Sequence, residues 1–477
     1  MKKPIRAVLV PLALIISSGL MPTPRASAQI FTNLHSLLFT NGTGPVASLI
    51  LSGNSLYGTT RIYGGGDGGG YGSVFKLNTD GSSFTTLHIF SGSAPEGGNL
   101  NSSLVLSGSA LYGTAAFGGD LDHGCIFAIN TNGPVATNVY SFSLLSPDFP
   151  STNSDGAYPE AGLILAGNRL YGMANGGGVK GAGSVFAVNL NGTGFTNLHS
   201  FGSADGQYPE ADLILSGNTL YGTTPGGGVS HYGNIFKINT DGSGFTNFYS
   251  FSQPSGSPPT NSDGAFPACS LVVSGNTLYG TAAEGGNAGS GTVFKLNTDG
   301  SGFGVLHHFT ATSGPLATNN DGARPHAGLT LSGNALYGTA SEGGASGNGT
   351  VFQVNTDGSG FTTLYSFTAT NGVAGTNSDG AHPVGGLIRS GATLYGTANA
   401  GGASGYGTVF SISLPPRLAI QSSGSNVVLT WPADVTGFSL QAATNLAPPV
   451  FWDAVSGQHS VTNPISGKQK FYRLIHP

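Results

Sequence analysis

Short apolar runs alternate with clusters of Gly, Ser, Asn and Asp along most of the chain. In one clear stretch, residues 213–215, 219–223, 234–240 and 245–251 are rich in leucine, β-branched and aromatic residues, and each run is too short for a stable helix. Gly217-Asn218 and Asp241-Gly242 tolerate the positive φ of a tight antiparallel turn. The pattern predicts a four-stranded antiparallel sheet, with hairpins between its first and second strands and between its third and fourth.

This unit recurs along the chain. The tripeptide Leu-Tyr-Gly brings the strand-like segments into register at intervals of 50 to 59 residues, with its tyrosine at Tyr57, Tyr112, Tyr171, Tyr221, Tyr279, Tyr337 and Tyr395. A period of this length, with four strands per unit, is typical of a β-propeller blade.

The fourth strand is out of phase with the other three. Residues 408–413, the third strand of the last unit, run into Pro415-Pro416 without a fourth strand, whereas residues 31–36 stand alone at the start and match residues 195–200 letter for letter. We predict that the N-terminal strand pairs with residues 408–413, which removes two free sheet edges. The predicted fold is all-β, with a seven-bladed β-propeller over residues 29–414 closed by the N-terminal strand. An open repeat array is the alternative, but it gives no reason for the offset.

Residues 415–477 differ in composition, with fewer glycines and both tryptophans. Segments 427–431 and 438–441 resemble early strands of a fibronectin type III-like sandwich, so a small C-terminal β domain is expected. This domain is interpreted as a sorting or surface-attachment module, or as a passive cap. Its strands are predicted over residues 418–421, 426–431, 438–443, 450–455, 460–461 and 471–475.

The first 28 residues have the pattern of a secretory signal peptide. Lys2, Lys3 and Arg6 precede an apolar stretch over residues 7–20, and Ala26-Ser27-Ala28 provides the small residues that a signal peptidase accepts. Cleavage is predicted before Gln29, which makes the mature protein secreted, extracellular or bound to the cell surface. A retained N-terminal anchor is the alternative, although the stretch is short for a membrane span.

Composition narrows the class of function. Gly supplies 80 of 477 residues and only 8% of residues are charged, which suits short strands joined by tight turns. Without the four basic residues of the signal segment, 12 basic and 21 acidic residues remain, a net charge of 12 − 21 = −9, and no basic patch predicts nucleic-acid binding. No later stretch is apolar enough to span a membrane. We expect a monomer without a cofactor.

The two cysteines, Cys125 and Cys269, fall in different units. We therefore expect two buried thiols and no disulfide. A stabilising bridge between distant units is the alternative.

The repeat resembles a known family. Residues 331–339 and 349–361 carry a long consensus that recurs over about residues 30–414 and is similar to the GloVer (Gloeo/Verruco) tandem repeat of exported bacterial proteins. The resemblance implies a secreted, propeller-like repeat protein with variable C-terminal ends and no established activity. Departures are small: Met173 replaces the usual Thr after Leu-Tyr-Gly, and the first two units lack the Asp-Gly element described next.

The fourth-to-first loops carry the candidate contact residues, because long loops on a rigid scaffold commonly bind ligands. Four of them contain Asn-x-Asp-Gly-Ala-x-Pro. Each copy offers one carboxylate and lacks the bidentate carboxylate of a calcium loop, so an Asx turn is favoured and no metal site is assigned. The residue before Pro varies and is predicted to face solvent. The candidates are Tyr158, Tyr208, Phe266, Arg324, His382, Asp155, Asp263, Asp321 and Asp379, with Arg61 and Tyr63 of the divergent first unit.

Two other patterns are interpreted as structural. The Gly-rich second-to-third loops lack the helix and lysine of a phosphate cradle. Glu284 and Glu342 precede two of their Gly pairs, and although glycoside cleavage needs paired carboxylates, their recurrence with the repeat favours structure. One fourth-strand position alternates between two residue types, as expected of packing and not of a metal ligand: His35, His88, Tyr140, His199, Tyr249, His307 and Tyr365.

Two functions remain. The favoured one is a secreted, non-catalytic scaffold that binds a polysaccharide, a protein or a cell-surface component through the long-loop face. The alternative is a carbohydrate-active hydrolase or lyase with acidic residues near the propeller axis. An enzyme needs units that break the pattern and bring unmatched acids, Arg or His into one pocket. Such breaks occur at Arg61, Tyr63, Asp67, Asp120, Asp122 and His123.

Overall fold

The computed structural model describes residues 29–62, 71–414, 419–423, 426–430, 439–444, 450, 452–455, 460–464 and 470–475. Every helix-or-strand element in this part of the chain is a β-strand. The chain divides into a larger unit, Gln29–Leu414, and a second unit that holds Pro415–Pro477. Within the described ranges, no helix is long and apolar enough to cross a membrane. The predicted signal segment and Tyr63 lie outside these ranges.

Seven four-stranded antiparallel sheets build the larger unit. Short strands joined by Gly-containing turns produce them, as the sequence predicts. Six of the sheets use strands that follow one another in the chain: β2 (Ile50–Ser52), β3 (Ser55–Thr60), β4 (Ser73–Asn78) and β5 (Thr85–Ile89); β7 (Val105–Ser107), β8 (Ala110–Ala115), β10 (Cys125–Asn130) and β11 (Ala136–Ser141); β12 (Ile164–Ala166), β13 (Arg169–Ala174), β14 (Ser184–Asn189) and β15 (Thr196–Ser200); β16 (Ile214–Ser216), β17 (Thr219–Thr224), β18 (Asn234–Asn239) and β19 (Thr246–Ser250); β20 (Val272–Ser274), β21 (Thr277–Ala282), β22 (Thr292–Asn297) and β23 (Gly304–His308); and β24 (Thr330–Ser332), β25 (Ala335–Ala340), β26 (Thr350–Asn355) and β27 (Thr362–Ser366). A short pair, β6 (Gly97–Gly98) and β9 (Phe117–Gly118), lies in the loops of the second sheet.

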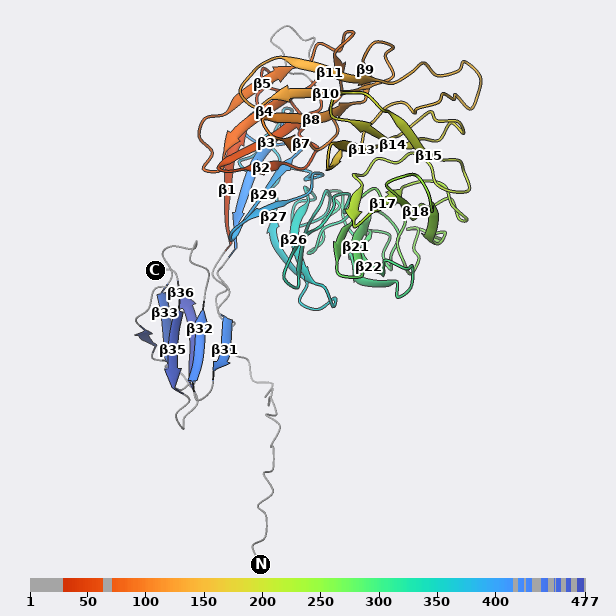
Figure 1. Ribbon diagram of the computed structural model, residues 1–477. Helices are drawn as coiled ribbons and strands as arrows, with labels where there is room; N and C mark the ends of the chain where they lie inside the picture. Colours follow the sequence, from red (N-terminus) through yellow and green to blue (C-terminus); the bar gives the residue numbers. More distant parts are fainter. Residues whose placement is uncertain are drawn as a thin grey trace, which may run out of the picture. The chain divides into compact units, whose positions relative to one another are not determined.

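The seventh sheet joins the two ends of the larger unit. Its order is β1 (Ile30–Ser36), β30 (Thr408–Ser413), β29 (Thr393–Ala398) and β28 (Ile388–Ser390). β1 runs antiparallel to β30, from Ile30 opposite Ser413 to Ser36 opposite Thr408. This is the pairing that the sequence predicts. In Figure 1 the sheets follow one another around the larger unit, and blue β29 lies near red β1.

The Leu-Tyr-Gly tripeptide has a packing reason. Gly222 of β17 lies opposite Phe236 of β18, and Phe236 is fully buried. A Cβ atom at Gly222 would lie 2.5 Å from the Cζ atom of Phe236. Only glycine leaves room for that ring, which then fills the space between neighbouring sheets.

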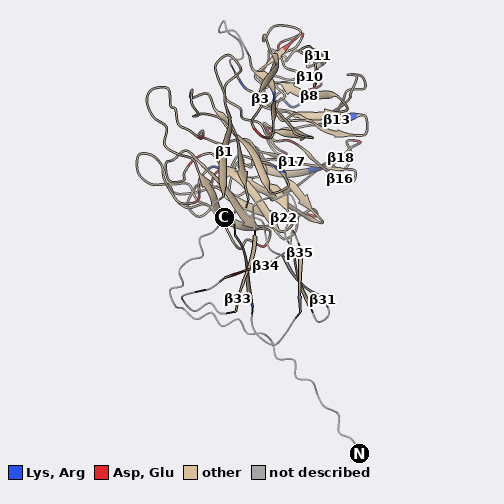
Figure 2. Cartoon of the chain, turned by 90° about the vertical axis from the view of Figure 1, so that its left-hand side faces the viewer, with Lys and Arg blue, Asp and Glu red and all other residues tan. Residues whose placement is uncertain are grey.

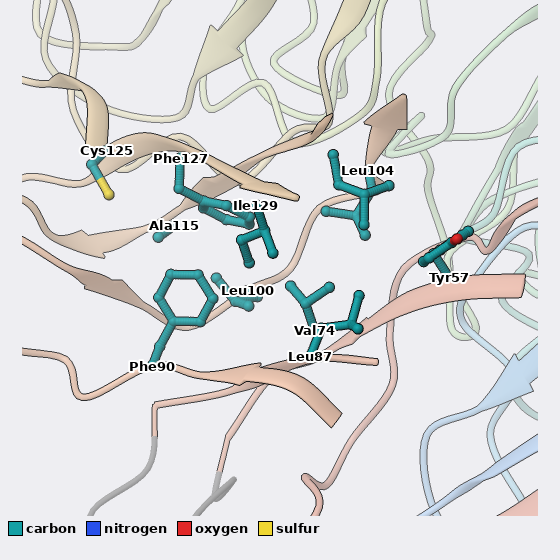
Figure 3. Packing of buried hydrophobic residues seen from close by; sticks show 11 residues of the cluster. Tyr57, Val74, Leu87, Phe90, Leu100, Leu104, Ala115, Cys125, Phe127 and Ile129 are labelled. Carbon is teal, nitrogen blue, oxygen red and sulfur yellow. The ribbon is translucent and has the colours of Figure 1, made fainter. Parts of the chain in front are cut away.

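Each pair of neighbouring sheets shares a buried apolar cluster. Figure 3 shows the cluster between the sheets β2–β5 and β7–β11, where Phe90 packs beside Phe127 with ring centroids 4.8 Å apart. The same arrangement joins the seventh sheet to the first, because Tyr395 and Val409 pack with Leu49. All seven neighbouring pairs have such a cluster, so the larger unit has a propeller-like all-β fold.

Aromatic stacking crosses the boundaries between sheets. At every sheet boundary except that of His88, the His or Tyr of a fourth strand lies flat against a Phe of the next sheet, as His199 does on Phe245 with ring centroids 3.5 Å apart. Tyr365 stacks in the same way on Phe31 of the N-terminal strand, at 4.0 Å. The position therefore needs a flat, polar-tipped ring, which explains why the repeats alternate between His and Tyr.

The second unit contains two three-stranded sheets. Leu429 and Leu440, one from each sheet, are buried in a shared cluster. The observed strands agree with the predicted ones, except that the fourth begins at Asp453 and the fifth extends to Pro464. One sheet has the order β31 (Ala419–Ser423), β32 (Asn426–Thr430), β35 (Ser460–Pro464), and the other the order β34 (Asp453–Val455), β33 (Ser439–Ala443), β36 (Phe471–Ile475).

Cys125 and Cys269 are free and almost fully buried, 1% and 2% exposed. Burial raises the pKa of the Cys125 thiol to about 12, and the charges of Asp120 and Glu96 add to the rise. Both thiols are therefore core groups in their protonated form, which confirms the prediction of two buried thiols.

Candidate functional site

The two sets of long loops meet at the same edge of each sheet. Isolated antiparallel bridges join the fourth-to-first loop to the second-to-third loop that follows it, for example Ala157 with Gly176 and Ala323 with Glu342. The other edge carries tight hairpins. We call the edge with both long loops the loop face. Charged residues are few and scattered in Figure 2, so the chemistry of this face depends on individual side chains.

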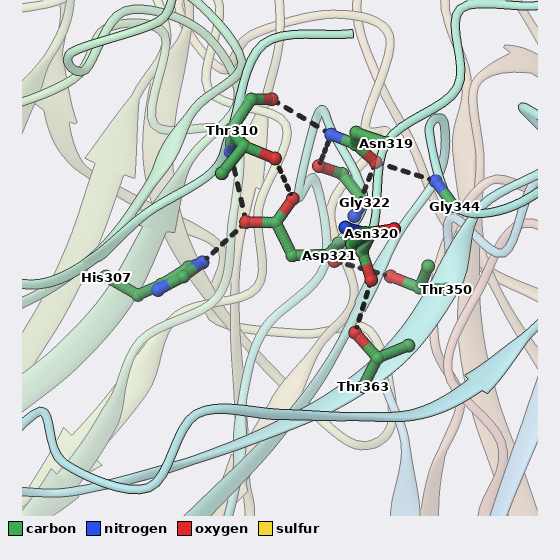
Figure 4. Close-up of polar contacts among 9 residues, drawn as sticks. All are labelled: His307, Thr310, Asn319, Asn320, Asp321, Gly322, Gly344, Thr350 and Thr363. Atoms are coloured by element: carbon green, nitrogen blue, oxygen red, sulfur yellow. Dashed lines mark hydrogen bonds and ion pairs between the residues drawn. The ribbon is translucent and has the colours of Figure 1, made fainter.

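The four aspartates of the repeated loop element form latches under the loop face. Asp321 is only 6% exposed. Its Oδ2 atom lies 3.0 Å from Nε2 of His307 and accepts the backbone N–H of Thr310 at 3.0 Å, and its Oδ1 atom accepts the Thr310 hydroxyl (Figure 4). Burial opposes ionisation of Asp321, but these hydrogen bonds outweigh it and hold its pKa below the usual value.

The same latch occurs in three other loops. Tyr140, Tyr249 and Tyr365 donate their hydroxyls to Asp155, Asp263 and Asp379 at 2.7–2.9 Å. These aspartates are 2–6% exposed. The sequence predicted Asp155, Asp263, Asp321 and Asp379 as ligand contacts, and this assignment is corrected here: buried carboxylates with filled acceptor positions hold the loops in place.

The turn cap is an asparagine and not the expected aspartate. Asn319 Oδ1 accepts the backbone N–H of Gly322 at 2.9 Å and that of Gly344 at 2.8 Å, and its amide donates to the carbonyl of Thr310 at 2.9 Å. A single side chain thus ties the two long loops together (Figure 4). Gly343 has a φ of +71°, and a Cβ atom there would lie 2.5 Å from Asn319 Oδ1, which accounts for glycine at this place.

The residues before Pro share a strained backbone. Tyr158, Tyr208, Phe266, Arg324 and His382 all have φ between 54° and 58°, a region that bulky residues rarely adopt. Each backbone N–H is fixed by a carbonyl of the preceding unit, as in Tyr208 to Ala182 at 3.0 Å. The backbone is thus held by the fold while the side chain varies, and such strained positions cluster at functional sites.

Two of these residues line a groove of about 610 Å³ on the loop face. Tyr158 and Tyr208 belong to the neighbouring units of β12–β15 and β16–β19, and Phe149 at the rim is 99% exposed. The side-chain amides of Asn175 and Gln207 also line the groove. The groove therefore combines aromatic faces with neutral hydrogen-bonding groups.

A second cavity, of about 450 Å³, collects residues from every unit, and we call it the central pocket. Arg61 is the one lining residue that follows a second strand. The others each precede a first strand: Val46, Asn101, Glu160, Glu210, Ala268, His326 and Val384.

The central pocket has a polar side. Burial raises the pKa of Glu160, against the opposing charge of Arg61. Burial also raises the pKa of Glu210, and the charge of Glu160 adds to that rise. The buried Oδ1 atom of Asn101 has no hydrogen-bond partner among the described residues. The two carboxyls offer hydrogen-bond acceptors to a ligand rich in hydroxyls.

His326 completes the titratable lining. Burial lowers its pKa, and the charge of Arg324 lowers it further. It therefore favours the neutral imidazole at physiological pH. Within the described ranges, no group of three or more His, Cys, Asp or Glu residues is placed to hold a metal ion.

The other predicted residues lie elsewhere. Arg324 is bound by Glu342 at 3.3 Å and Glu284 at 3.8 Å, so these glutamates are a surface ion-pair group and do not line the central pocket. Arg61 reaches the pocket, and its Nε donates to Asn99 Oδ1 at 3.1 Å. Asp120, Asp122 and His123 do not line it. Tyr63 and Asp67 fall outside the described part of the chain.

Sequence reasoning missed Glu160, Glu210 and His326. A signal was present: six of the pocket positions directly follow a Pro, five of them in the loop element, and their residues change from unit to unit. The pocket residues lie two places after the variable residue before Pro. Asn101 follows Leu100 and carries no such signal.

Comparisons with known proteins bear on the family and the fold. The model of a family described as the Gloeobacter/Verrucomicrobia repeat matches residues 21–153, 145–262, 260–374 and 316–439. No curated protein matches the chain.

Solved structures resemble the chain only distantly. The GH74 enzyme of Niastella koreensis is 15% identical, with 90% of this chain and 60% of that chain covered and a TM-score of 0.47. PorZ of Porphyromonas gingivalis, a surface component of the type-IX secretion system, is 13% identical, with coverage of 93% and 59% and a TM-score of 0.47. An oligogalacturonate lyase of Vibrio parahaemolyticus is 10% identical, with coverage of 81% and 97% and a TM-score of 0.45. The chain spans about 60% of the first two proteins, and none of these activities is carried over.

Proposed function

The chain belongs to the Gloeobacter/Verrucomicrobia repeat family, and from that premise we propose that its repeats close into a seven-bladed β-propeller that binds a polysaccharide outside the cell. Closure is supported by the seven shared clusters, including the one between the seventh sheet and the first. It is also supported by His35 of the N-terminal strand, which stacks on Phe84 of the first unit with ring centroids 3.9 Å apart. A closed ring leaves no sheet boundary unpaired.

The groove beside Tyr158 and Tyr208 is the observation that carries the binding function. A sugar ring offers a C–H face that packs on an aromatic ring and hydroxyls that bond to amides, and the groove supplies both kinds of partner. Lys180 is the one charged residue among the described residues that line it, and it is paired with Asp205 at 2.8 Å. A neutral stretch of glycan therefore fits the groove better than a charged polymer.

A protein partner is the competing outcome. Stable protein interfaces bury about 1,200–2,000 Å² and have a dry apolar centre. The lining of this groove instead includes the amides of Asn175 and Gln207 beside its aromatic rings. The observations therefore favour the polysaccharide.

Export completes the proposal. The basic residues, apolar stretch and small residues of positions 1–28 support release of a mature chain that begins at Gln29. We further propose that the mature protein is a monomer and that its second unit, a small sandwich-like domain, serves sorting or attachment to the cell surface.

The test is a binding screen of residues 29–477 against soluble glycans and a preparation of surface proteins. Tyr208→Asn removes one ring and keeps a residue suited to the left-handed backbone, since Asn99 has a φ of 60°. Loss of one stacking contact is worth about 1 kcal/mol, so affinity should fall by roughly fivefold to tenfold. Phe266→Asn, at the same repeat position but outside the groove, is the matched control and should bind normally. Binding to protein alone, or equal losses in both variants, would contradict the proposal.

A further inference from the structure

The central pocket differs between units in a way that packing does not require. The units of β12–β15 and β16–β19 contribute Glu160 and Glu210, whereas other units contribute Val46, Ala268 and Val384 at the same place. An apolar residue satisfies the fold at that place in those units, so the fold does not require the half-buried Glu160 or the exposed Glu210. The same two units form the groove.

The groove and the central pocket adjoin. Asn175 lines the groove, and its amide Nδ2 atom donates to Glu210 Oε1 in the central pocket at 3.4 Å. A chain of sugars that lies on Tyr158 and Tyr208 would therefore reach Glu210 at one end. This step rests on the proposed polysaccharide-binding function.

The two carboxyls have different surroundings. The charge of Arg61 favours the ionised form of Glu160, whereas the charge of Glu160 disfavours ionisation of Glu210. Burial raises both pKa values, but the neighbouring charges act on them in opposite directions, and such a difference can divide the roles of acid and base between two carboxyls. Among the described residues, no ion pair within 4.0 Å neutralises either glutamate.

We propose that the central pocket hydrolyses a glycosidic bond of the polysaccharide held in the groove, with Glu210 as general acid and Glu160 as general base. Glu210 gives its proton to the leaving oxygen as the bond between that oxygen and the anomeric carbon breaks. Glu160 takes a proton from a water molecule as the water oxygen bonds to the same carbon. One water is consumed, two sugar ends are released, and the proton returns from Glu160 to Glu210 through solvent.

The pocket selects a neutral sugar. With Glu210 protonated as the general acid, the ionised Glu160 balances the charge of Arg61, so the pocket has no net positive charge to attract the carboxylate of a uronic acid. Asn101 and the neutral His326 add hydrogen-bonding groups without charge. The substrate class is therefore a neutral polysaccharide.

The experiment measures release of reducing ends by residues 29–477 from soluble neutral β-glucans and mannans, with polygalacturonate as the anionic comparison. Glu210→Gln and Glu160→Gln should each lower the rate about 100-fold or more, the usual contribution of a general acid or base. Both variants should bind glycan with the affinity of the wild type, whereas Tyr208→Asn binds more weakly. Glu284→Gln and Glu342→Gln, which alter carboxyls outside the pocket, should cleave normally.

The pH profile gives a second readout, because a structural role would not shape it. Among the described residues, Arg61, Glu160, Glu210 and His326 are the titratable groups that line the pocket. The rate should fall at acid pH as Glu160 takes up a proton and at alkaline pH as Glu210 loses its own. Glu210→Gln should abolish the alkaline limb of the residual activity.

Three results would overturn the inference. Binding of neutral glycans without any release of reducing ends would refute catalysis and leave the proposed binding function intact. Preferential cleavage of polygalacturonate would refute the neutral substrate. Absence of binding to every glycan would refute the proposed function itself, and the inference with it.

Discussion

The units β12–β15 and β16–β19 form one neighbouring pair, and the units β20–β23 and β24–β27 form another. Both pairs have the same backbone arrangement, which we call the frame, but they carry different side chains at its variable positions. In the first pair, the strained residues are Tyr158 and Tyr208, and the next positions but one carry unpaired carboxyls. In the second pair, Arg324 occupies the strained position and is bound to Glu284 and Glu342 on the surface. The backbone is the same in both pairs, yet the first pair lines a groove, whereas the charged side chains of the second pair bind one another.

The difference shows how a repeat protein separates stability from function. The Asp latches, the Asn caps and the Leu-Tyr-Gly glycines recur because each fills a fixed place in the frame. The backbone of each residue before Pro is held by a hydrogen bond to the preceding unit, so its side chain is free to differ. Differences between repeats at these positions therefore point to the units that carry function, here β12–β15 and β16–β19, which we call the functional sector.

The prediction with the largest expected effect tests whether both unit pairs share the same frame. Gly222→Ala and Gly338→Ala would each place a Cβ atom 2.5 Å from a buried Phe ring. Each variant should lose about 3 kcal/mol of unfolding free energy through overpacking, measured by chemical denaturation. Gly217→Ala is the control, since its Cβ atom meets nothing within 4 Å and only a φ of +61° opposes it, at a cost of about 1 kcal/mol. Unequal losses at Gly222 and Gly338 would show that the two pairs do not share one frame.

A smaller effect concerns Asp212, which only the groove pair contains. Asp212 Oδ1 accepts the backbone N–H of Gly162 at 2.6 Å and so links the two strands that follow Glu160 and Glu210. Gly328 occupies the same place in the second pair. Desolvation raises the pKa of Asp212 above its usual value of 3.8. The ionised carboxylate therefore destabilises the fold, and stability should fall as pH rises from 3.8 through the raised pKa.

Asp212→Asn removes this titration while keeping an oxygen for Gly162. The variant should match the wild type at low pH and exceed it by about 1 kcal/mol at neutral pH, where the buried charge is avoided. Thermal unfolding across that pH range measures the difference. A gap that is constant with pH, or a variant that is less stable at neutral pH, would contradict the role of the carboxylate charge.

The frame was predictable because its determinants are local. Asp241-Gly242 and the phase of Phe31–Ser36 specify turns and pairing through neighbouring residues and the repeat itself. The central pocket could not be predicted, because Glu160, Glu210 and Arg61 come together only once the sheets are arranged in the fold. The latches could not be predicted for the same reason. Asp321 and His307 recur at fixed repeat positions, but the sequence does not show that their side chains lie 3.0 Å apart in the fold.

The smallest expected effect tests whether the latches belong to the frame alone. His307→Tyr converts the Asp321 latch to the form of Tyr249 with Asp263, where the hydroxyl lies 2.9 Å from the carboxylate. Because both rings are flat and donate to the same oxygen, the unfolding free energy at pH 7 should change by no more than about 0.5 kcal/mol. Tyr249→His is the reciprocal control. Glycan binding should be unchanged in both variants, since neither latch lines the groove or the central pocket. A loss of binding with normal stability would assign the His307 latch to the functional sector and break the distinction between the two unit pairs.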